Sequence, residues 1–206
     1  MDLITHIHVE SLCLNRGARI LFNGLSFTVA AGEAVVLVGA NGVGKTSLLR
    51  AIAGLIRPSA GEIRFVGGGA FIDADEARRE HCHLIGHQDG LCGRRTARQE
   101  LAFAVKWCGG DTETVVARAR RLDLEKLLDL EVRRLSAGQR RRLALVRLVA
   151  VRRRIWLLDE PLAPVDARGR EQIGVAMEEH LATGGLIVAA VHDPLPIAAR
   201  AIEVGA

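Results

Sequence analysis

The feature that most constrains the fold is a glycine-rich segment set between an apolar run and a helical pattern. The segment Gly39-Ala40-Asn41-Gly42-Val43-Gly44-Lys45-Thr46 matches the phosphate-loop pattern G-x-x-x-x-G-K-S/T in full. Residues 34–38 before it have the apolar character of a buried parallel strand, and residues 47–53 after it have the apolar spacing of a helix. Strand, loop and helix in this order predict an α/β core that binds a nucleotide.

The chemistry of this loop comes from its backbone and from the side chains at its end. Glycines let backbone N–H groups turn toward phosphate oxygens, and the N-terminus of the following helix adds the positive end of its dipole. We expect Lys45 to hold the β- and γ-phosphates and the Thr46 hydroxyl to ligate Mg²⁺, with Ser47 beside them. The alternative is a glycine-rich turn that binds nothing, which the flanking strand and helix disfavour.

Two adjacent carboxylates end a second apolar run. The run Ile155-Trp156-Leu157-Leu158 precedes Asp159 and Glu160, which predicts a buried central strand with both acids at its carboxyl end. Ligands of open α/β sheets gather at that edge. We expect Asp159 to hold Mg²⁺ through water, and Glu160 to orient the attacking water and take its proton. The alternative is a strand that ends in two acids without a catalytic role.

A loop and a helix lie between these two motifs. The loop is Leu135-Ser136-Ala137-Gly138-Gln139, and helical spacing continues over residues 140–148. Ser136 and the backbone N–H of Gly138 would stand at the N-terminal end of that helix, where an anion is favoured. The apolar positions of the helix that are available for packing are Leu143, Val146 and Leu148.

The same helix begins with a basic cluster, Arg140-Arg141-Arg142. Such a cluster could indicate nucleic-acid binding. The arginines interleave with apolar core positions, however, and no aromatic residue lies among them to stack on a base. We therefore expect these arginines on a solvated or interdomain face, and no nucleic-acid partner.

Taken in order, the phosphate loop, the 135–139 loop and the 155–161 segment resemble the ATPase subunits of ABC transporters over nearly the whole chain. In that family the loop corresponding to 135–139 contacts the γ-phosphate bound by the opposite subunit. The resemblance therefore implies a homodimer with ATP and Mg²⁺ as its ligands. It also implies that Gln88 is the Q-loop glutamine that senses γ-phosphate and Mg²⁺, that Asp166 belongs to the D-loop, and that His192 is the switch histidine.

Two positions depart from the family pattern. ABC ATPases commonly stack the adenine on an aromatic residue upstream of the phosphate loop, whereas this chain has no tyrosine and reads Leu14-Asn15-Arg16-Gly17 in that region. Arg16 is the candidate there, because a guanidinium group can stack on a base. Pro164 replaces the more usual small residue of the D-loop, which stiffens the loop without removing Asp166.

The expected fold class is α/β: an ABC-type P-loop NTPase core with an N-terminal antiparallel β-subdomain and an inserted helical subdomain. The chain would form one domain over 1–206, made of the nucleotide-binding core with its β-subdomain (1–88 and 135–206) and the helical subdomain (89–134). Within this plan, residues 1–35 are expected to supply antiparallel strands and residues 36–86 the first part of the nucleotide core.

Composition excludes several other classes of protein. With 206 residues, 49% of them hydrophobic and 25% charged, the chain suits one domain with an ordinary core. No apolar run is long enough to span a bilayer, because Arg147 and Arg152 interrupt the best candidate, and the N-terminus lacks the pattern of a signal peptide. We therefore expect membrane contact only through partners. The net charge of +4 permits an acidic membrane surface or a nucleotide and decides nothing.

The cysteines at positions 13, 82, 92 and 108 are scattered and form no C-x-x-C pair, which is typical of free thiols in a cytoplasmic protein. The segment His81-Cys82-His83, with His87 nearby, suggests a metal or haem site. Alternation along a strand would, however, send Cys82 to the opposite face from the two histidines. A structural role is therefore the preferred interpretation.

Four blocks of sequence narrow the resemblance to the CcmA family, the ATP-binding subunits of bacterial cytochrome c maturation. They are residues 19–27, 39–42, 86–91 and 135–142, whereas 92–96 departs from that family. The resemblance implies an ATP-hydrolysing subunit that energises a haem-delivery step in c-type cytochrome biogenesis. It would act with a CcmB-like integral membrane permease and further cytochrome c maturation membrane proteins, as a peripheral protein on the cytoplasmic face of the bacterial inner membrane.

Three alternatives stay open at this point. The first is the ATPase subunit of another small ABC importer or exporter, with the same chemistry and a different cargo. The second is a soluble ABC ATPase acting on nucleic acid or ribosomes, which usually carries two ATPase halves or long coiled-coil insertions that this chain lacks. The third is a nucleotide-binding regulator without turnover, which the presence of Lys45, Asp159 and Glu160 disfavours.

Overall fold

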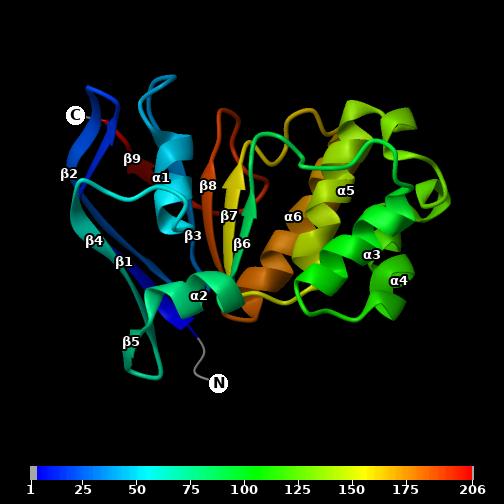
Figure 1. Ribbon diagram of the computed structural model, residues 1–206, viewed down its shortest axis with the longest axis horizontal. Coiled ribbons are helices and arrows are strands. Elements are labelled where there is room, and N and C mark those ends of the chain that lie inside the picture. Colours follow the sequence, from blue (N-terminus) through cyan, green and yellow to red (C-terminus); the bar gives the residue numbers. More distant parts are fainter. Residues whose placement is uncertain (1–3, 206) are drawn as a thin grey trace. The chain divides into compact units, whose positions relative to one another are not determined.

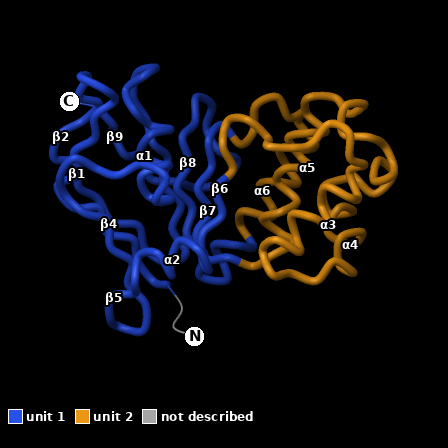
Figure 2. The backbone as a smooth tube through the Cα atoms, in the orientation of Figure 1, with its two compact units in different colours: residues 1–84, 153–160, 179–206 blue, residues 85–152, 161–178 orange. Residues whose placement is uncertain are grey.

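The computed structural model describes residues 4–205, which form two compact units (Figures 1 and 2). Of the described residues, unit 1 comprises 4–84, 153–160 and 179–205, and unit 2 comprises 85–152 and 161–178. The chain thus leaves unit 1 twice, after Leu84 and after Glu160. Each unit is assembled from segments that are distant in the sequence.

Unit 1 contains a four-stranded antiparallel sheet of order β2-β1-β4-β5. Its strands are β1 (Ile4–Arg16), β2 (Arg19–Ala30), β4 (Ala60–Gly67) and β5 (Ala70–Ile72). The antiparallel strands expected within residues 1–35 are confirmed. The structure differs from the expectation for residues 36–86, because β4 and β5 join this sheet. Their link to it, such as the pairing of Val9 with Ile63, joins positions far apart in the chain, and no local pattern predicts such a pairing.

The second sheet of unit 1 has the order β6-β7-β8-β3-β9. Its strands are β3 (Ala34–Val38), β6 (Cys82–Ile85), β7 (Ile155–Asp159), β8 (Leu186–Ala190) and β9 (Arg200–Glu203). Strand β8 pairs in parallel with β7 and with β3, and every residue of β7 and β8 is buried. Parallel sheets are usually covered on both faces, which explains the unbroken apolar runs. The carboxyl ends of β3, β7 and β8 therefore lie side by side.

The hydrophobic core of unit 1 is built around α1 (Lys45–Ile52) and takes side chains from both sheets. Leu48, Leu49 and Ile52 are fully shielded from solvent and belong to one cluster with residues of β1, β3, β7 and β8. This packing fixes helix α1 and, with it, the loop that precedes it. A second helix, α2 (Ala74–His81), begins after Asp73, whose carboxylate accepts hydrogen bonds from the first-turn backbone.

Unit 2 is helical. Its helices are α3 (Ala97–Trp107), α4 (Val115–Arg120), α5 (Ala137–Ala150) and most of α6 (Ala167–Ala182), with 3₁₀ turns at Thr112–Thr114, Glu125–Leu127 and Val132–Arg134. The packing positions predicted for α5 are confirmed, since Leu143, Val146 and Leu148 are buried. Among residues 4–205, none of the helices has both the length and the apolar character that crossing a membrane requires.

The segment His81-Cys82-His83 changes secondary structure at its second residue. His81 ends α2, whereas Cys82 and His83 begin β6 and are both buried. The expected strand alternation is therefore wrong for His81, because the strand starts only after it. Burial raises the pKa of the Cys82 thiol to about 12. At neutral pH this residue is a thiol, whereas metal ligation uses the thiolate.

Candidate functional site

The phosphate loop has a backbone that only glycine adopts easily. Gly39 and Gly44 have φ values of 141° and 117°, in the region that disfavours side chains. A Cβ atom added at Gly39 would lie 2.4 Å from the carbonyl oxygen of Val204, and one added at Gly44 would lie 3.2 Å from Cε1 of Phe22. Gly39 and Gly44 are thus required both by backbone conformation and by close packing.

Lys45 is held within the loop that precedes it. Its side chain is only 8% exposed, and Nζ donates hydrogen bonds to the carbonyl oxygens of Gly39 at 2.6 Å and of Ala40 at 3.3 Å. No acidic residue stands in the first turn of α1. A lysine ammonium and the positive end of a helix dipole therefore meet at one place, which is an anion-binding arrangement.

The structure brings the phosphate loop to the first of the two predicted acids. The Thr46 hydroxyl donates a hydrogen bond to Oδ1 of Asp159 at 3.0 Å, across 113 positions of sequence. Asp159 is 3% exposed at the end of β7. A hydroxyl oxygen beside a carboxylate is the kind of oxygen donor set that Mg²⁺ prefers, so these two residues fit the ion expected from the sequence.

Glu160 and His192 form a second pair at this sheet edge. Nε2 of His192 lies 3.5 Å from Oε1 of Glu160, and the His192 backbone N–H donates to Oε2 at 3.3 Å. The backbone of Glu160 has a φ of 49°, and its N–H donates to the carbonyl oxygen of Ala190 at 2.9 Å. A left-handed backbone costs a residue with a side chain about 1–2 kcal/mol, and such strain concentrates at functional sites.

In unit 2, the 135–139 loop forms a reciprocal cap on α5. Ser136 Oγ accepts a hydrogen bond from the Gln139 backbone, and the Gln139 side chain accepts one from the Ser136 backbone. A capping box of this kind satisfies N–H groups that a helix leaves without partners. The motif residues therefore have a structural role at the helix start in addition to the phosphate contact expected of them.

The D-loop lies against the same helix start. A Cβ atom added at Gly138 would lie 3.0 Å from the carbonyl oxygen of Pro164, so glycine permits close approach here. Oδ1 of Asp166 accepts a hydrogen bond from the backbone N–H of Gly169 at 2.9 Å, in the first turn of α6. Gln88, also in unit 2, is exposed. Gly138, Asp166 and Gln88 thus belong to unit 2, whereas the phosphate-loop residues belong to unit 1.

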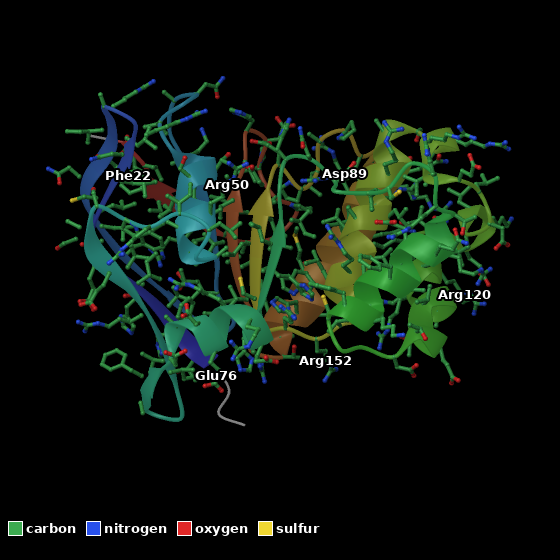
Figure 3. The ribbon with its side chains drawn as sticks, viewed as in Figure 1. Phe22, Arg50, Glu76, Asp89, Arg120 and Arg152 are labelled. Atoms are coloured by element: carbon green, nitrogen blue, oxygen red, sulfur yellow. The ribbon has the colours of Figure 1, made fainter. Side chains whose placement is uncertain are left out.

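The hairpin of β1 and β2 meets the phosphate loop through residues that sequence reasoning missed. Arg16, the candidate for adenine, is exposed at the hairpin end opposite Arg19. The atoms that approach Gly44 belong instead to Leu21 and Phe22, which are buried. Figure 3 labels Phe22. The available signal was the apolar run Ile20-Leu21-Phe22, which follows the turn of the hairpin at residues 17 and 18.

A second residue that the motifs did not single out is Arg141. The arginines at the start of α5 were expected on a solvated or interdomain face, but Arg141 is only 2% exposed within unit 2. A solvated face is wrong at this position, because backbone carbonyls and a carboxylate bind the guanidinium group.

Comparison with known proteins agrees with the site geometry. The model of the ABC transporter family matches residues 22–163. A protein of Rhodopseudomonas palustris named cytochrome c biogenesis ATP-binding export protein CcmA is 49% identical over 191 residues, which cover 93% of this chain and 94% of the relative.

Solved structures share the fold. An ATP-binding subunit of an ABC transporter aligns with a TM-score of 0.79 at 24% identity, covering 91% of this chain and 80% of the other. A dimeric ATP-binding cassette in a post-hydrolysis state, bound to ADP and Pi, aligns with a TM-score of 0.74 at 21% identity, covering 91% and 88%. The predicted fold class and the resemblance drawn from the motifs are confirmed. This chain belongs to the ABC transporter family and, within it, to the CcmA proteins of cytochrome c biogenesis.

Proposed function

We propose that this chain is the ATP-hydrolysing subunit of a transporter that energises haem delivery in c-type cytochrome biogenesis. The observation that carries the enzymatic part is the convergence of two pairs, Thr46 with Asp159 and Glu160 with His192, at the carboxyl ends of neighbouring parallel strands. That edge is where open α/β sheets bind their ligands. The cytochrome part rests on relatives that carry that name at 49% and 47% identity.

Each side chain has a role that its surroundings support. The loop 39–47 binds the phosphates of ATP through backbone N–H groups, with Lys45 neutralising the β- and γ-phosphates. Thr46, Asp159 and Gln88 would hold Mg²⁺, which lowers the charge repulsion on the phosphates when bound. Glu160 takes the proton of the attacking water, and the imidazole of His192 beside it orients that carboxylate toward the nucleotide.

The remaining motif residues serve a second subunit in this proposal. Ser136, Gly138 and Asp166 act on the nucleotide of the opposite subunit of a homodimer, as the positive end of α5 suits an anion. One ABC domain spans 1–206, with a nucleotide-binding core (1–88 and 135–206) and a helical subdomain (89–134). A CcmB-like permease anchors the dimer at the cytoplasmic face of the inner membrane.

Because the nucleotide site is shared between two subunits in this proposal, the specific ATPase rate should rise with protein concentration. A rate per subunit that stays constant with dilution down to the monomer would refute the shared site.

Glu160→Gln tests the enzymatic part. The amide keeps the size of the side chain but cannot take a proton, so turnover should fall by about 100-fold or more while ATP binding persists. Glu178→Gln, on an exposed position of α6, is the matched control and should retain the parent rate. Steady-state phosphate release and equilibrium binding of a fluorescent ATP analogue measure the two quantities. Near-parent turnover in Glu160→Gln would exclude this residue as the base.

A cellular experiment tests the cytochrome part. Cells whose only copy carries Lys45→Ala should lack covalently bound haem in c-type cytochromes, while b-type cytochromes persist. Haem-peroxidase staining of denaturing gels and whole-cell difference spectra distinguish the two classes. Normal c-type bands in that strain would leave the ATPase proposal standing and assign the chain to a transporter of another cargo.

A further inference from the structure

Arg141 is a buried cation of unit 2. It lies one turn into α5 and is 2% exposed, and among residues 4–205 it is the largest of the fully buried side chains. Arginine is almost never fully buried unless its charge and its N–H groups are satisfied, because an unpaired buried charge is strongly destabilising. The hydrogen-bond partners of this guanidinium group therefore identify the segments that it fixes against α5.

Those partners come from two segments remote in sequence. Arg141 Nη1 donates to the carbonyl oxygen of Gly86 at 2.8 Å and to Oδ1 of Asp89 at 3.0 Å. Its Nε donates to the carbonyl oxygen of Pro161 at 3.2 Å. Arg147, six residues further along α5, donates from Nη2 to the carbonyl oxygen of Asp89 at 3.5 Å. A single side chain thus joins the Q-loop segment (residues 86–91) to the residue that follows Glu160.

Both segments are the places where the chain enters unit 2. It crosses from unit 1 after Leu84, two residues before Gly86, and after Glu160, one residue before Pro161. Gln88 lies between the two Q-loop residues that Arg141 binds, and Glu160 is covalently attached to the third. The helix that carries Arg141 is the one capped by Ser136. Arg141 therefore makes hydrogen bonds next to Gln88 and next to Glu160, from the same helix that begins at the 135–139 loop.

We propose that Arg141 is a positioning residue that holds the Q-loop segment and the segment that begins at Pro161 against helix α5, so that Gln88 keeps a fixed position relative to the 135–139 loop within unit 2. The proposal rests on the ATPase function proposed above. Asp89 supplies a counter-charge, since Oδ1 of its carboxylate accepts a hydrogen bond from Arg141 Nη1 at 3.0 Å. The forked guanidinium is required because it donates from two separate nitrogens, whereas the three N–H donors of a lysine ammonium share one nitrogen that cannot reach the acceptors on both segments.

Arg141→Lys tests this role. In the folded dimer, kcat should fall by about 10- to 100-fold, because small misplacements of reacting groups carry penalties of that size. KM for ATP should stay within about twofold, because the phosphate loop is untouched. Amide hydrogen exchange should quicken in residues 86–91 and 161–166 and stay unchanged in unit 1. Arg152→Lys is the matched control; Arg152 is exposed, and Figure 3 shows it at the far end of unit 2 from Asp89.

Asp89→Asn gives a second variant that keeps an oxygen acceptor and removes the counter-charge. It should reproduce the loss of kcat, and the double variant with Arg141→Lys should be little worse than Arg141→Lys alone, because both act through one contact.

A folded Arg141→Lys protein with kcat within twofold of the parent, or with exchange quickened throughout the chain, would overturn the inference. Should Arg141→Lys fail to fold, parent-like kcat and exchange in Asp89→Asn would overturn it equally. A parent without ATPase activity would refute the proposed function instead, and the exchange comparison would still decide whether Arg141 holds the two segments.

Discussion

The stacked pair of Trp156 and His180 makes the stability of unit 1 depend on pH. The ring centroids are 3.8 Å apart with planes inclined by 10°, and Trp156 is 3% exposed on β7. Burial lowers the pKa of His180 from 6.5 to about 4; backbone hydrogen bonds to Leu186 and Arg154 oppose this shift, and the charge of Arg154 adds to it. The folded protein therefore keeps this imidazole neutral at pH values where the unfolded chain protonates it.

The direction of the effect follows from proton binding. Between pH 6.5 and about 4 the unfolded state binds a proton at this histidine that the folded state does not, so stability falls as pH falls through that window. The contribution is complete above the unfolded pKa and is lost below the folded pKa. At about 1.4 kcal/mol per pKa unit, the whole loss is about 3 kcal/mol. About 2 kcal/mol of it is lost between pH 7 and pH 5.

Urea unfolding at pH 7 and pH 5 measures this quantity. In a Trp107→Phe background, fluorescence reports only Trp156, because the chain has two tryptophans. The variant His180→Phe keeps a ring against Trp156 and cannot take a proton. The free energy of unfolding should fall by about 2 kcal/mol more in the parent than in His180→Phe. The control variant His87→Phe replaces an exposed histidine, and its free energy of unfolding should fall between pH 7 and pH 5 by as much as that of the parent. Equal losses in the parent and in His180→Phe would refute the reasoning.

Three further changes probe the nucleotide site. Lys45→Ala should weaken ATP binding by at least about tenfold, since its ammonium meets phosphate in the ground state; unchanged affinity by equilibrium dialysis would contradict that role. Gly39→Ala should abolish nucleotide binding, because an added Cβ would meet the Val204 carbonyl. Gly42→Ala should reduce binding only modestly, because a Cβ there meets nothing within 4 Å. Calorimetric titration with ATP compares the affinities of the two variants. Arg16→Ala should lower affinity for ATP relative to inorganic triphosphate, and an identical effect in Arg19→Ala would show that only net charge matters.

The candidate site was largely predictable because its motifs are local. The glycines of residues 39–44 must adopt particular φ values, and apolar runs before and after them have the periods of a strand and a helix. These properties depend on neighbours in sequence, so the residue pattern identifies them. The roles of Gln88, Ser136 and Asp166 came from family resemblance, and they remain proposals.

Burial of a charged residue was not predictable in the same way. An arginine within Arg140–Arg142 belongs by default on the surface, because desolvating a cation is unfavourable. Burial of Arg141 is tolerated because Gly86, Pro161 and Asp89 offer oxygen atoms to its N–H groups. Those acceptors lie 20 to 55 positions away, so local sequence contains no sign of them.

By itself, the sequence determined the phosphate loop, the buried run 155–158 with its two acids, and the helix after Ser136. Each of these follows from backbone preference and hydrophobic period over a few residues. Only the tertiary structure decided which runs become neighbours: β4 beside β1, Thr46 beside Asp159, and His192 beside Glu160. A hydrophobic pattern states that a strand is buried, but not which strand it pairs with, since that choice depends on how all the apolar faces are covered at once.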